Sequence, residues 1–599
     1  MSEQNSGPES FFKAQTALYE TRLQQVKKQI ARVATGRIMS FLLTVLGIYL
    51  SAGYGPVPVS CIALAGFSVF GFFVFRHVRL FRQKAYTEKL LSINQNELRL
   101  FRRDTSQQPT GEAFAVAHHP FAGDLDLFGQ GSLFQLLDRC ATFLGRRRLA
   151  AFLNFPSKTP ETIRKRQQAI AELAADPHWR QEFQAAGSGE DTAADSLLQW
   201  AVTGKTHFSK PVFLFLLWLT PLLGFADILL ISLGILPIGS FFLFLMLPFA
   251  VLVPRQAEIQ QAFMLLGKKS AQMEQYARLF EKLERKKFNS GIMQDAVKVL
   301  AGGEDSAFVA VKKLSDISKA FDYRLNLLVG IFLNVFFLWD IMQSRRLGQW
   351  KKRYGNKMDS WFDVLAQTDA LCSLAGFAFQ HPKAVYPHPV KDRFLLRGQN
   401  LKHPFIDPAV CVGNPVNIEG WGYFQVITGA NMAGKSTYLR TVGVNFVLAM
   451  TGAPVLADEF VFTPVQLFTG IKTSDSLQDG ESYFFAELKR LKEIIERLEK
   501  GERLFILLDE ILRGTNSKDK QKGSQALLKQ LIRLGASGMI ATHDLSLGAL
   551  QKEFPENVVN KRFEVEIINN RLQFDYLLKE GISQNLNATF LMKKMGITV

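Results

Sequence analysis

Residues 429–436 read G-A-N-M-A-G-K-S, a spacing that suits the binding of a nucleoside triphosphate. Glycines let the backbone curl so that successive N–H groups point at phosphate oxygens, and a following helix adds the positive end of its dipole. Lys435 can then reach the β- and γ-phosphates while the Ser436 hydroxyl ligates Mg²⁺. An apolar run at 423–427 and a helical run at 438–450 flank this segment, which predicts a strand–loop–helix site for ATP and Mg²⁺. The residues expected to contact the nucleotide here are Gly429, Asn431, Met432, Gly434, Lys435, Ser436 and Thr437.

Two further apolar runs end in residues that suit phosphoryl transfer. Residues 504–510 read L-F-I-L-L-D-E, typical of a buried parallel strand whose carboxyl end faces a ligand. We expect Asp509 to hold the Mg²⁺ shell and Glu510 to polarise the attacking water. The alternative is an exposed acidic turn after a core strand. A third strand at 538–541 ends beside His543, which is interpreted as a sensor of the γ-phosphate, although a lone histidine also serves structural roles.

Together these residues resemble the MutS mismatch-repair ATPases, a branch of the ABC ATPases. T-G-A-N-M-A-G-K-S-T at 428–437 is similar to the family's T-G-P-N-M-G-G-K-S-T, and D-E-I-L-R-G-T at 509–515 is similar to D-E-I-G-R-G-T. A-T-H at 541–543 resembles its switch, and residues 576–583 resemble its last ATPase element. The match implies an α/β ATPase domain at 396–599.

The segment 468–484 resembles the family's signature, which ends G-R-S-T-F. Gly480 and Ser482 precede a helical stretch and would form another anion-binding helix start. In ABC-type ATPases this start caps the γ-phosphate held by the partner subunit, so the resemblance implies a homodimer with composite sites and a catalytic role for Ser482. An ordinary N-capped helix is the alternative.

Four positions depart from the family pattern. Ala430 replaces a proline, Ala433 and Leu512 replace glycines, and Glu481 replaces an arginine. The two alanines are small enough to permit phosphate approach. Glu481 places a negative charge near the expected composite interface, which bears on the rate of turnover.

The resemblance extends more weakly to the region before the ATPase. Residues 132–145, 155–156 and 163–170 resemble the start of the helical core of MutS proteins, and residues 365–374 resemble its closing helix. We therefore expect a helical core, or lever, over residues 111–395.

Two long apolar tracts do not belong to that family. Residues 38–75 are nearly free of charge and are broken only at 53–56, and residues 211–253 form a second tract with one acid, Asp227. Each arm is close to the ~20 residues that cross a bilayer. Two such hairpins predict an α-helical protein that is anchored in the lipid bilayer through residues 1–110 and through the middle of the core, with buried soluble helices as the alternative.

Charges around the tracts predict their orientation. Lysines and arginines flank both tracts, whereas the turn at 53–56 has no charge, so the positive-inside rule places both ends in the cytoplasm. We expect a multi-pass protein of the cell (inner) membrane whose ATPase faces the cytoplasm. Asp227 is expected in the outward turn rather than within a span. The stretch 325–339 is short, contains Asn326 and Asn334, and is expected to be a buried core helix.

The net charge of +17 could be balanced by two kinds of anionic partner, lipid and DNA. Residues 1–104 hold 14 Lys and Arg against 6 Asp and Glu, a net of +8, which anionic lipid explains. The runs at 146–148 and 282–287 could contact DNA phosphates or form solvated helix faces. The four cysteines have no paired or metal-binding spacing.

Two hypotheses for function follow. In the first, ATP binding and hydrolysis are coupled to DNA binding of the mismatch-repair type. The segment before the core is short, however, and has an apolar tract in place of the family's mismatch-reading domain. In the second, a mechanical or scaffolding ATPase at the bilayer binds no DNA.

Overall fold

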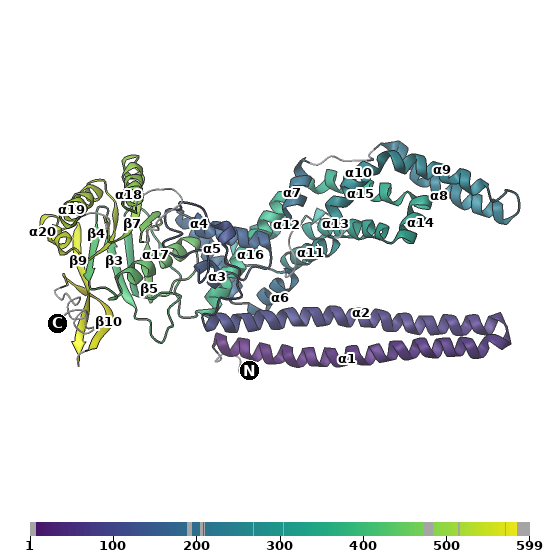
Figure 1. Ribbon diagram of the computed structural model, residues 1–599, viewed down its shortest axis with the longest axis horizontal. Coiled ribbons are helices and arrows are strands. Elements are labelled where there is room, and N and C mark those ends of the chain that lie inside the picture. Colours follow the sequence, from purple (N-terminus) through teal and green to yellow (C-terminus); the bar gives the residue numbers. More distant parts are fainter. Residues whose placement is uncertain are drawn as a thin grey trace.

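A computed structural model describes residues 7–187, 194–203, 208, 210–267, 269–302, 305–471, 483–512, 516–568 and 571–583. A helical region is followed by a C-terminal α/β domain, as the sequence predicts. Figure 1 shows the α/β domain at one end, a helical core in the middle, and two helical arms that extend from the core in the same direction.

A six-stranded sheet forms the centre of the α/β domain, in the order β10-β9-β4-β8-β7-β6. The strands from β9 to β6 are parallel, and β10 pairs antiparallel with β9. Strands β4, β7 and β8 are fully buried apolar runs, which is expected of parallel strands covered on both faces. These strands are β4 (Phe424–Gly429), β6 (Gln466–Gly470), β7 (Leu504–Asp509), β8 (Ser537–Thr542), β9 (Val558–Ile568) and β10 (Arg571–Glu580).

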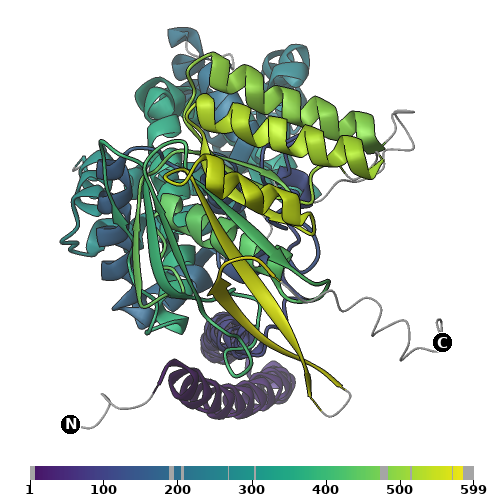
Figure 2. The same ribbon diagram turned by 90° about the vertical axis from the view of Figure 1, so that its left-hand side faces the viewer.

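Helices cover both faces of this sheet. One face packs on α17 and joins a continuous apolar core that extends into the helical region. The opposite face packs on α18 and α19 around a second cluster, and Figure 2 shows these helices and α20 together on one side. The helices are α17 (Lys435–Thr451), α18 (Tyr483–Glu499), α19 (Ser517–Arg533) and α20 (Leu550–Glu553).

A smaller four-stranded sheet lies beside the first, in the order β1-β5-β2-β3. Its strands are β1 (His388–Pro389), β2 (Leu395–Leu401), β3 (Asn414–Glu419) and β5 (Glu459–Phe462). Alternating burial along β3 shows that one face of this sheet is covered and the other is exposed.

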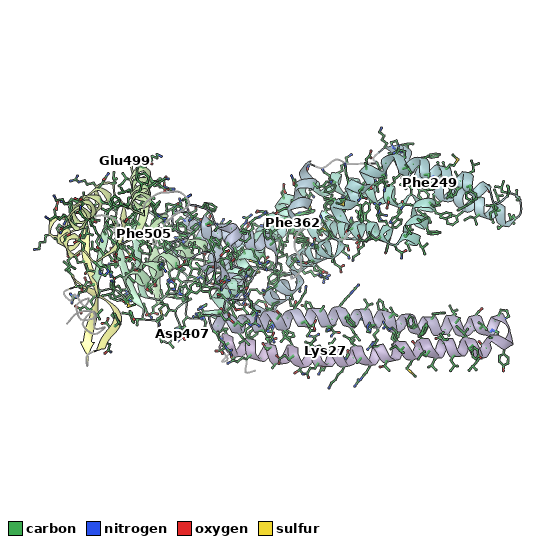
Figure 3. The ribbon with its side chains drawn as sticks, viewed as in Figure 1. Lys27, Phe249, Phe362, Asp407, Glu499 and Phe505 are labelled. Atoms are coloured by element: carbon green, nitrogen blue, oxygen red, sulfur yellow. The ribbon has the colours of Figure 1, made fainter. Side chains whose placement is uncertain are left out.

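The helical core is built from amphipathic helices. In α11, for example, Met273, Tyr276, Phe280 and Leu283 are buried at intervals of three and four residues, while lysines and arginines occupy the other face. Figure 3 places Phe362 of α16 in the helical core and Phe505 inside the α/β domain. The core helices are α3 (Leu133–Leu137), α4 (Phe143–Asn154), α5 (Pro160–Ala174), α6 (Pro177–Gly187), α7 (Ala194–Thr203), α10 (Gln256–Leu266), α11 (Ser270–Arg285), α12 (Gly291–Leu300), α13 (Ala307–Asp322), α15 (Trp339–Tyr354) and α16 (Met358–Gln380).

The first arm is a hairpin of two long helices, α1 (Pro8–Ser51) and α2 (Pro56–Phe101). The chain reverses at residues 52–55, where Gly55 has φ +94°, in agreement with the predicted break. Large apolar side chains near this turn point outward; Tyr54 is 80 % exposed and Leu64 is 74 % exposed. The second half of α2 contains buried Leu90, Asn94 and Glu97, so this half packs on the core.

The second arm contains α8 (Pro211–Ser232) and α9 (Ser240–Leu252), joined by a short turn at 233–239. This agrees with the predicted second hairpin. The expectation for Asp227 was wrong: it lies within α8, five residues before the helix ends, because the turn comes later than the sequence pattern indicated.

The expectation of a buried helix at 325–339 was also wrong. Helix α14 (Leu327–Phe337) packs beside α8 and α9 in the second arm, with Leu328 80 % exposed. The two asparagine side chains make hydrogen bonds to the backbone. Asn326 caps the helix, and Asn334 bonds to the backbone of Gly330 and Asp340. An apolar helix therefore extends the surface of the second arm.

Four helices in the described part of the chain are long and apolar enough to cross a membrane. They are Pro8–Tyr54, Pro56–Phe101, Pro211–Ser232 and Ser240–Leu266. Helix α14 and the helix before it also pass this test as one segment bent by 111°.

Candidate functional site

The loop between β4 and α17 has the backbone shape that its glycines allow. Gly429 ends β4 with φ +154°, and Gly434 caps α17 with φ +107°. A Cβ atom at Gly429 would lie 2.7 Å from the carbonyl oxygen of Phe563, so only glycine fits there. Helix α17 begins at Lys435, which places Ser436 and Thr437 in its first turn. The helix N-terminus therefore faces the same space as the loop.

Lys435 connects the loop to the neighbouring strand ends. Its ammonium group donates to the carbonyl oxygens of Gly429 at 2.9 Å and Ala430 at 3.1 Å, and its Nζ lies 3.1 Å from His543 Nε2. The side chain is only 5 % exposed. Phosphate oxygens would replace these carbonyl partners without a large movement of the lysine.

The tips of β7 and β8 bring the predicted catalytic residues together. His543 Nε2 lies 2.8 Å from a carboxylate oxygen of Glu510. The Glu510 backbone N–H donates to the carbonyl of Ala541 at 2.8 Å, and its φ of +50° turns the chain sharply after β7. Asp509, the last residue of β7, is 7 % exposed. Lys435, His543 and Glu510 thus form one connected polar chain across three adjacent strands.

A cavity of about 420 Å³ opens beside this chain. Its lining includes the predicted Asn431, Met432, Gly434, Lys435, Ser436, Thr437 and Glu510. Gly429, Asp509 and His543 do not line the cavity. Most of the residues expected at a nucleotide site therefore surround one hollow.

The cavity also has walls that sequence reasoning missed. Asn414 of β3 and Tyr576 of β10 line it, together with apolar residues of the segment 401–412. The Asn414 amide donates to the Tyr576 carbonyl at 2.9 Å and accepts from Leu578 N–H at 2.8 Å. An irregularity in the β9–β10 pairing, with φ +54° at Tyr576, brings this strand to the loop. No spacing in the sequence connects these residues to residues 429–436.

Tyr438 stabilises the start of α17 and has no role as an acid or base. Its hydroxyl donates to the Pro415 carbonyl at 2.7 Å, and burial raises its pKa far above the ordinary value. The hydroxyl therefore stays protonated and holds α17 to β3.

Magnesium fits the oxygen atoms available here. The described part of the chain has no group of three or more His, Cys, Asp or Glu side chains that could hold a metal. Mg²⁺ usually binds through one or two protein oxygens, with phosphates and waters completing the shell. Ser436 and Asp509 would supply those two oxygens.

Leu512 shows how this chain accommodates a departure from the expected motif. It adopts φ +60°, a conformation that costs an ordinary residue about 1–2 kcal/mol. Its N–H donates to the Glu487 carboxylate at 2.5 Å, and the side chain is 8 % exposed. Burial and this hydrogen bond offset the strain. Gly480, Glu481 and Ser482 lie outside the described residues.

The arginine run at 146–148 pairs with acids of the same chain. Arg146, Arg147 and Arg148 form ion pairs with Asp138, Asp195 and Asp363, respectively. The structure favours the interpretation of this run as an internally paired helix face.

Comparison with known families supports the resemblance. A family model described as MutS domain V matches residues 425–594, which contain the cavity loop and the tips of β7 and β8. A second, described as MutS domain III, matches residues 118–196 of the helical core. Residues 118–196 and 425–594 are therefore similar to two domains of MutS proteins.

Curated MutS relatives match about two fifths of the chain. DNA mismatch repair protein MutS of Thermotoga petrophila is 31 % identical over 239 residues, 39 % of this chain and 29 % of the relative. MutS of Aquifex pyrophilus is 34 % identical over 39 % of this chain and 27 % of its own length, and that of Chloroflexus aurantiacus is 32 % identical over 39 % and 24 %. The chain therefore matches less than a third of the length of these relatives.

Proposed function

We propose that this protein is a membrane-anchored, MutS-type ATPase that binds ATP with Mg²⁺ between β4 and α17. The observation that carries the proposal is the polar chain from Lys435 through His543 to Glu510 at one edge of the sheet. In this proposal Lys435 holds the β- and γ-phosphates, Ser436 and Asp509 hold Mg²⁺, and Glu510 aligns water. His543 contacts both Lys435 and Glu510, which suits a sensor of the γ-phosphate.

The structure offers a route from this site to the helical core. Arg490 of α18 donates to the Asp124 carboxylate at 2.9 Å, and Thr469 at the end of β6 donates to the same carboxylate at 2.6 Å. Asp124 belongs to the segment that leads into α3. A rearrangement of α18 would therefore reach the core directly. The composite site with Gly480 and Ser482 of a second subunit, and hence the homodimer, belongs to this proposal.

Membrane anchoring rests on the two arms. Both extend away from the α/β domain in the same direction (Figure 1), so one bilayer can hold both. Trp218, Phe242 and Leu328 are each more than 70 % exposed, a pattern that suits lipid rather than water. The positive flanks of both tracts support a cytoplasmic location for the α/β domain. We propose a division into an anchoring region (1–110), a core with the second hairpin (111–395) and an ATPase domain (396–599).

The first candidate for the coupled activity is DNA binding, because the relatives are DNA mismatch repair proteins. The second candidate, a mechanical ATPase that binds no DNA, is favoured by one observation. At the end of the core farthest from the ATPase domain lie the apolar helices α8, α9 and α14. DNA binding at this end would need exposed basic residues to contact the phosphates.

The test uses the full chain in detergent, because the continuous apolar core includes residues from 121 to 201, which the isolated C-terminal domain would lack. We expect magnesium-dependent ATP binding and hydrolysis that Lys435→Ala abolishes. Lys492→Ala, on the exposed face of α18, is the control and should change neither. Equal turnover in wild type and Lys435→Ala would overturn the proposed site.

DNA binding and membrane insertion are tested separately. Duplex affinity that falls steeply with salt, with ATP turnover changed by DNA, would favour the first candidate. Absence of both would favour the second. Release of the protein from membranes by alkaline carbonate would refute anchoring.

A further inference from the structure

A large cavity lies between the first arm and the helical core, away from the proposed ATP site. It has a volume of about 780 Å³, compared with about 420 Å³ beside residues 429–436. Its walls come from the core half of α2, from α6 and from α11. Figure 1 shows α2 on one side of this space and α11 on the other.

Positive charge dominates the walls. Acidic side chains of Asp176, Glu274 and Glu281 also reach the cavity, but they are outnumbered two to one. The basic residues that line it are Arg82, Lys89, Arg278, Lys282, Arg285 and Lys286. The basic run at 282–287, noted in the sequence, therefore lies along one wall of this cavity.

Several of these cations already have acidic neighbours. Lys282 pairs with Glu182 at 2.7 Å, and Arg285 pairs with Glu281 at 2.6 Å. Lys286 pairs with Asp176 at 2.5 Å, and Arg278 lies 3.7 Å from Glu274. Lys286 lies over the Trp179 ring at 4.6 Å from its centre and fixes that aromatic wall. These contacts orient the basic side chains on α11 without neutralising the whole set.

Lys89 of α2 and Arg278 of α11 line the same cavity from two different helices. Burial, followed by the positive charge of Arg278, lowers the pKa of Lys89. Two cations held near each other in a partly buried place favour an anion between them. A group with several negative oxygens would reduce the repulsion between α2 and α11.

The position along α2 places this cavity near the proposed bilayer surface. Arg82 follows the end of the apolar tract, residue 75, by seven residues, or about 10 Å of helix at ~1.5 Å per residue. The cavity is therefore within reach of a charged lipid headgroup and is also open to soluble anions.

We propose that the cavity between α2 and α11 is a second anion site, which binds a phosphate-bearing ligand and bridges the first arm and the helical core. Lys89 and Arg278 bind the phosphate from opposite walls, and the other basic side chains accommodate further charge. The site is independent of the ATP site, and the source of the phosphate is either a lipid headgroup or a soluble phosphate compound.

The experiment uses the full chain carrying Lys435→Ala, so that the loop at 429–436 does not bind the probe. Inorganic pyrophosphate is titrated by calorimetry in neutral detergent. In parallel, phosphatidylglycerol is added to delipidated protein, and retained lipid is counted by native mass spectrometry. The test variant is Lys89→Gln with Arg278→Gln. The control is Lys298→Gln with Lys492→Gln, two lysines whose side chains are about three-quarters exposed and which do not line the cavity.

We expect the test variant to bind at least tenfold more weakly and the control to bind normally, because each lost charge-assisted hydrogen bond is a strong one. This loss for pyrophosphate would identify a soluble ligand, and the same loss for phosphatidylglycerol alone would identify a lipid headgroup. Equal binding by all three proteins, or no binding of either probe, would overturn the proposal.

Two further measurements complete the test. Binding of a short DNA duplex that depends on Lys89 and Arg278, without binding of either small probe, would also overturn it and assign the surface to nucleic acid. If the test variant fails to fold, as judged by gel filtration and circular dichroism, Arg82→Gln with Lys282→Gln replaces it, with the same expected loss.

Discussion

Glu97, close to the end of α2, accepts a hydrogen bond from Arg139 Nε at 2.9 Å, and both side chains are buried to more than nine-tenths. Gln380 of α16 donates to the other Glu97 carboxylate oxygen at 2.6 Å. Arg139 Nη1 also donates to the carbonyls of Leu136 and Leu137. One carboxylate therefore joins the first arm to the core and to the helix that leads into the α/β domain.

Glu97→Ala should destabilise the protein by about 3–5 kcal/mol, because it leaves the Arg139 charge buried without its partner. The thermal midpoint of the detergent-solubilised chain measures this loss. Asp295→Ala is the control, since its pair with Lys298 is solvent-exposed and should contribute little. Equal midpoints for the two variants would contradict a structural role for the Glu97 contact. A deletion of residues 1–104 would remove Glu97 together with the first apolar tract. Such a deletion would therefore change the stability of the core as well as membrane association.

Gly429→Ala should weaken ATP binding by more than tenfold, because the new Cβ would meet the backbone of Phe563 and no side chain can move aside. Gly420→Ala is the matched control. Gly420 has φ +92° but open space around it, so this change adds only the backbone cost of about 1–2 kcal/mol. Fluorescent-nucleotide titration and thermal midpoints of both variants distinguish the steric clash at Gly429 from the backbone strain expected at Gly420. Similar nucleotide affinity in the two variants would argue against a tight loop.

Glu510→Gln should slow ATP turnover about a hundredfold or more while nucleotide binding is kept, because the amide no longer acts as a base toward water. His543→Ala should also slow turnover, since it removes the group between Lys435 and Glu510. Single-turnover hydrolysis with saturating ATP measures both. Glu556→Gln, an exposed acid in the same domain, is the control. Wild-type rates in Glu510→Gln would refute its proposed role.

Acid should destabilise this protein partly through His381. Burial lowers its pKa from 6.5 to about 4, and its Nδ1 contacts the Phe377 carbonyl at 3.0 Å. Between these two pKa values the unfolded chain binds a proton that the folded chain does not, so stability falls as pH drops from about 6.5 to about 4. Below pH 4 both states bind the proton and this loss is complete.

Comparison with His381→Gln isolates this effect from other titrating groups. The wild-type free energy of unfolding should change with pH by up to about 1.4 kcal/mol per pH unit more than that of the variant, within that window only. Thermal midpoints at pH 4 to 7 give the comparison. Parallel curves for the two proteins would show that the histidine does not titrate differently on folding.

Much of the site could be predicted because its parts are local. Residues 429–436 specify their own loop through two glycines, and the apolar runs before Gly429 and Glu510 specify buried strands. The roles of Gly480 and Ser482 stay predictions, since those residues lie outside the described chain. The hairpin turn at 52–55 was likewise evident from a local break in hydrophobicity.

The sequence by itself determined the short-range features: the phosphate-binding spacing, the strands that end in acids, and two apolar hairpins with basic flanks. Tertiary structure alone decided which distant residues meet: Lys435 with His543, Glu97 with Arg139, and Lys89 opposite Arg278. It also moved α14 to the outer surface of the second arm. The reason is physical: periodicity and turn chemistry act within a few residues, whereas contacts between distant residues depend on how whole helices and strands pack.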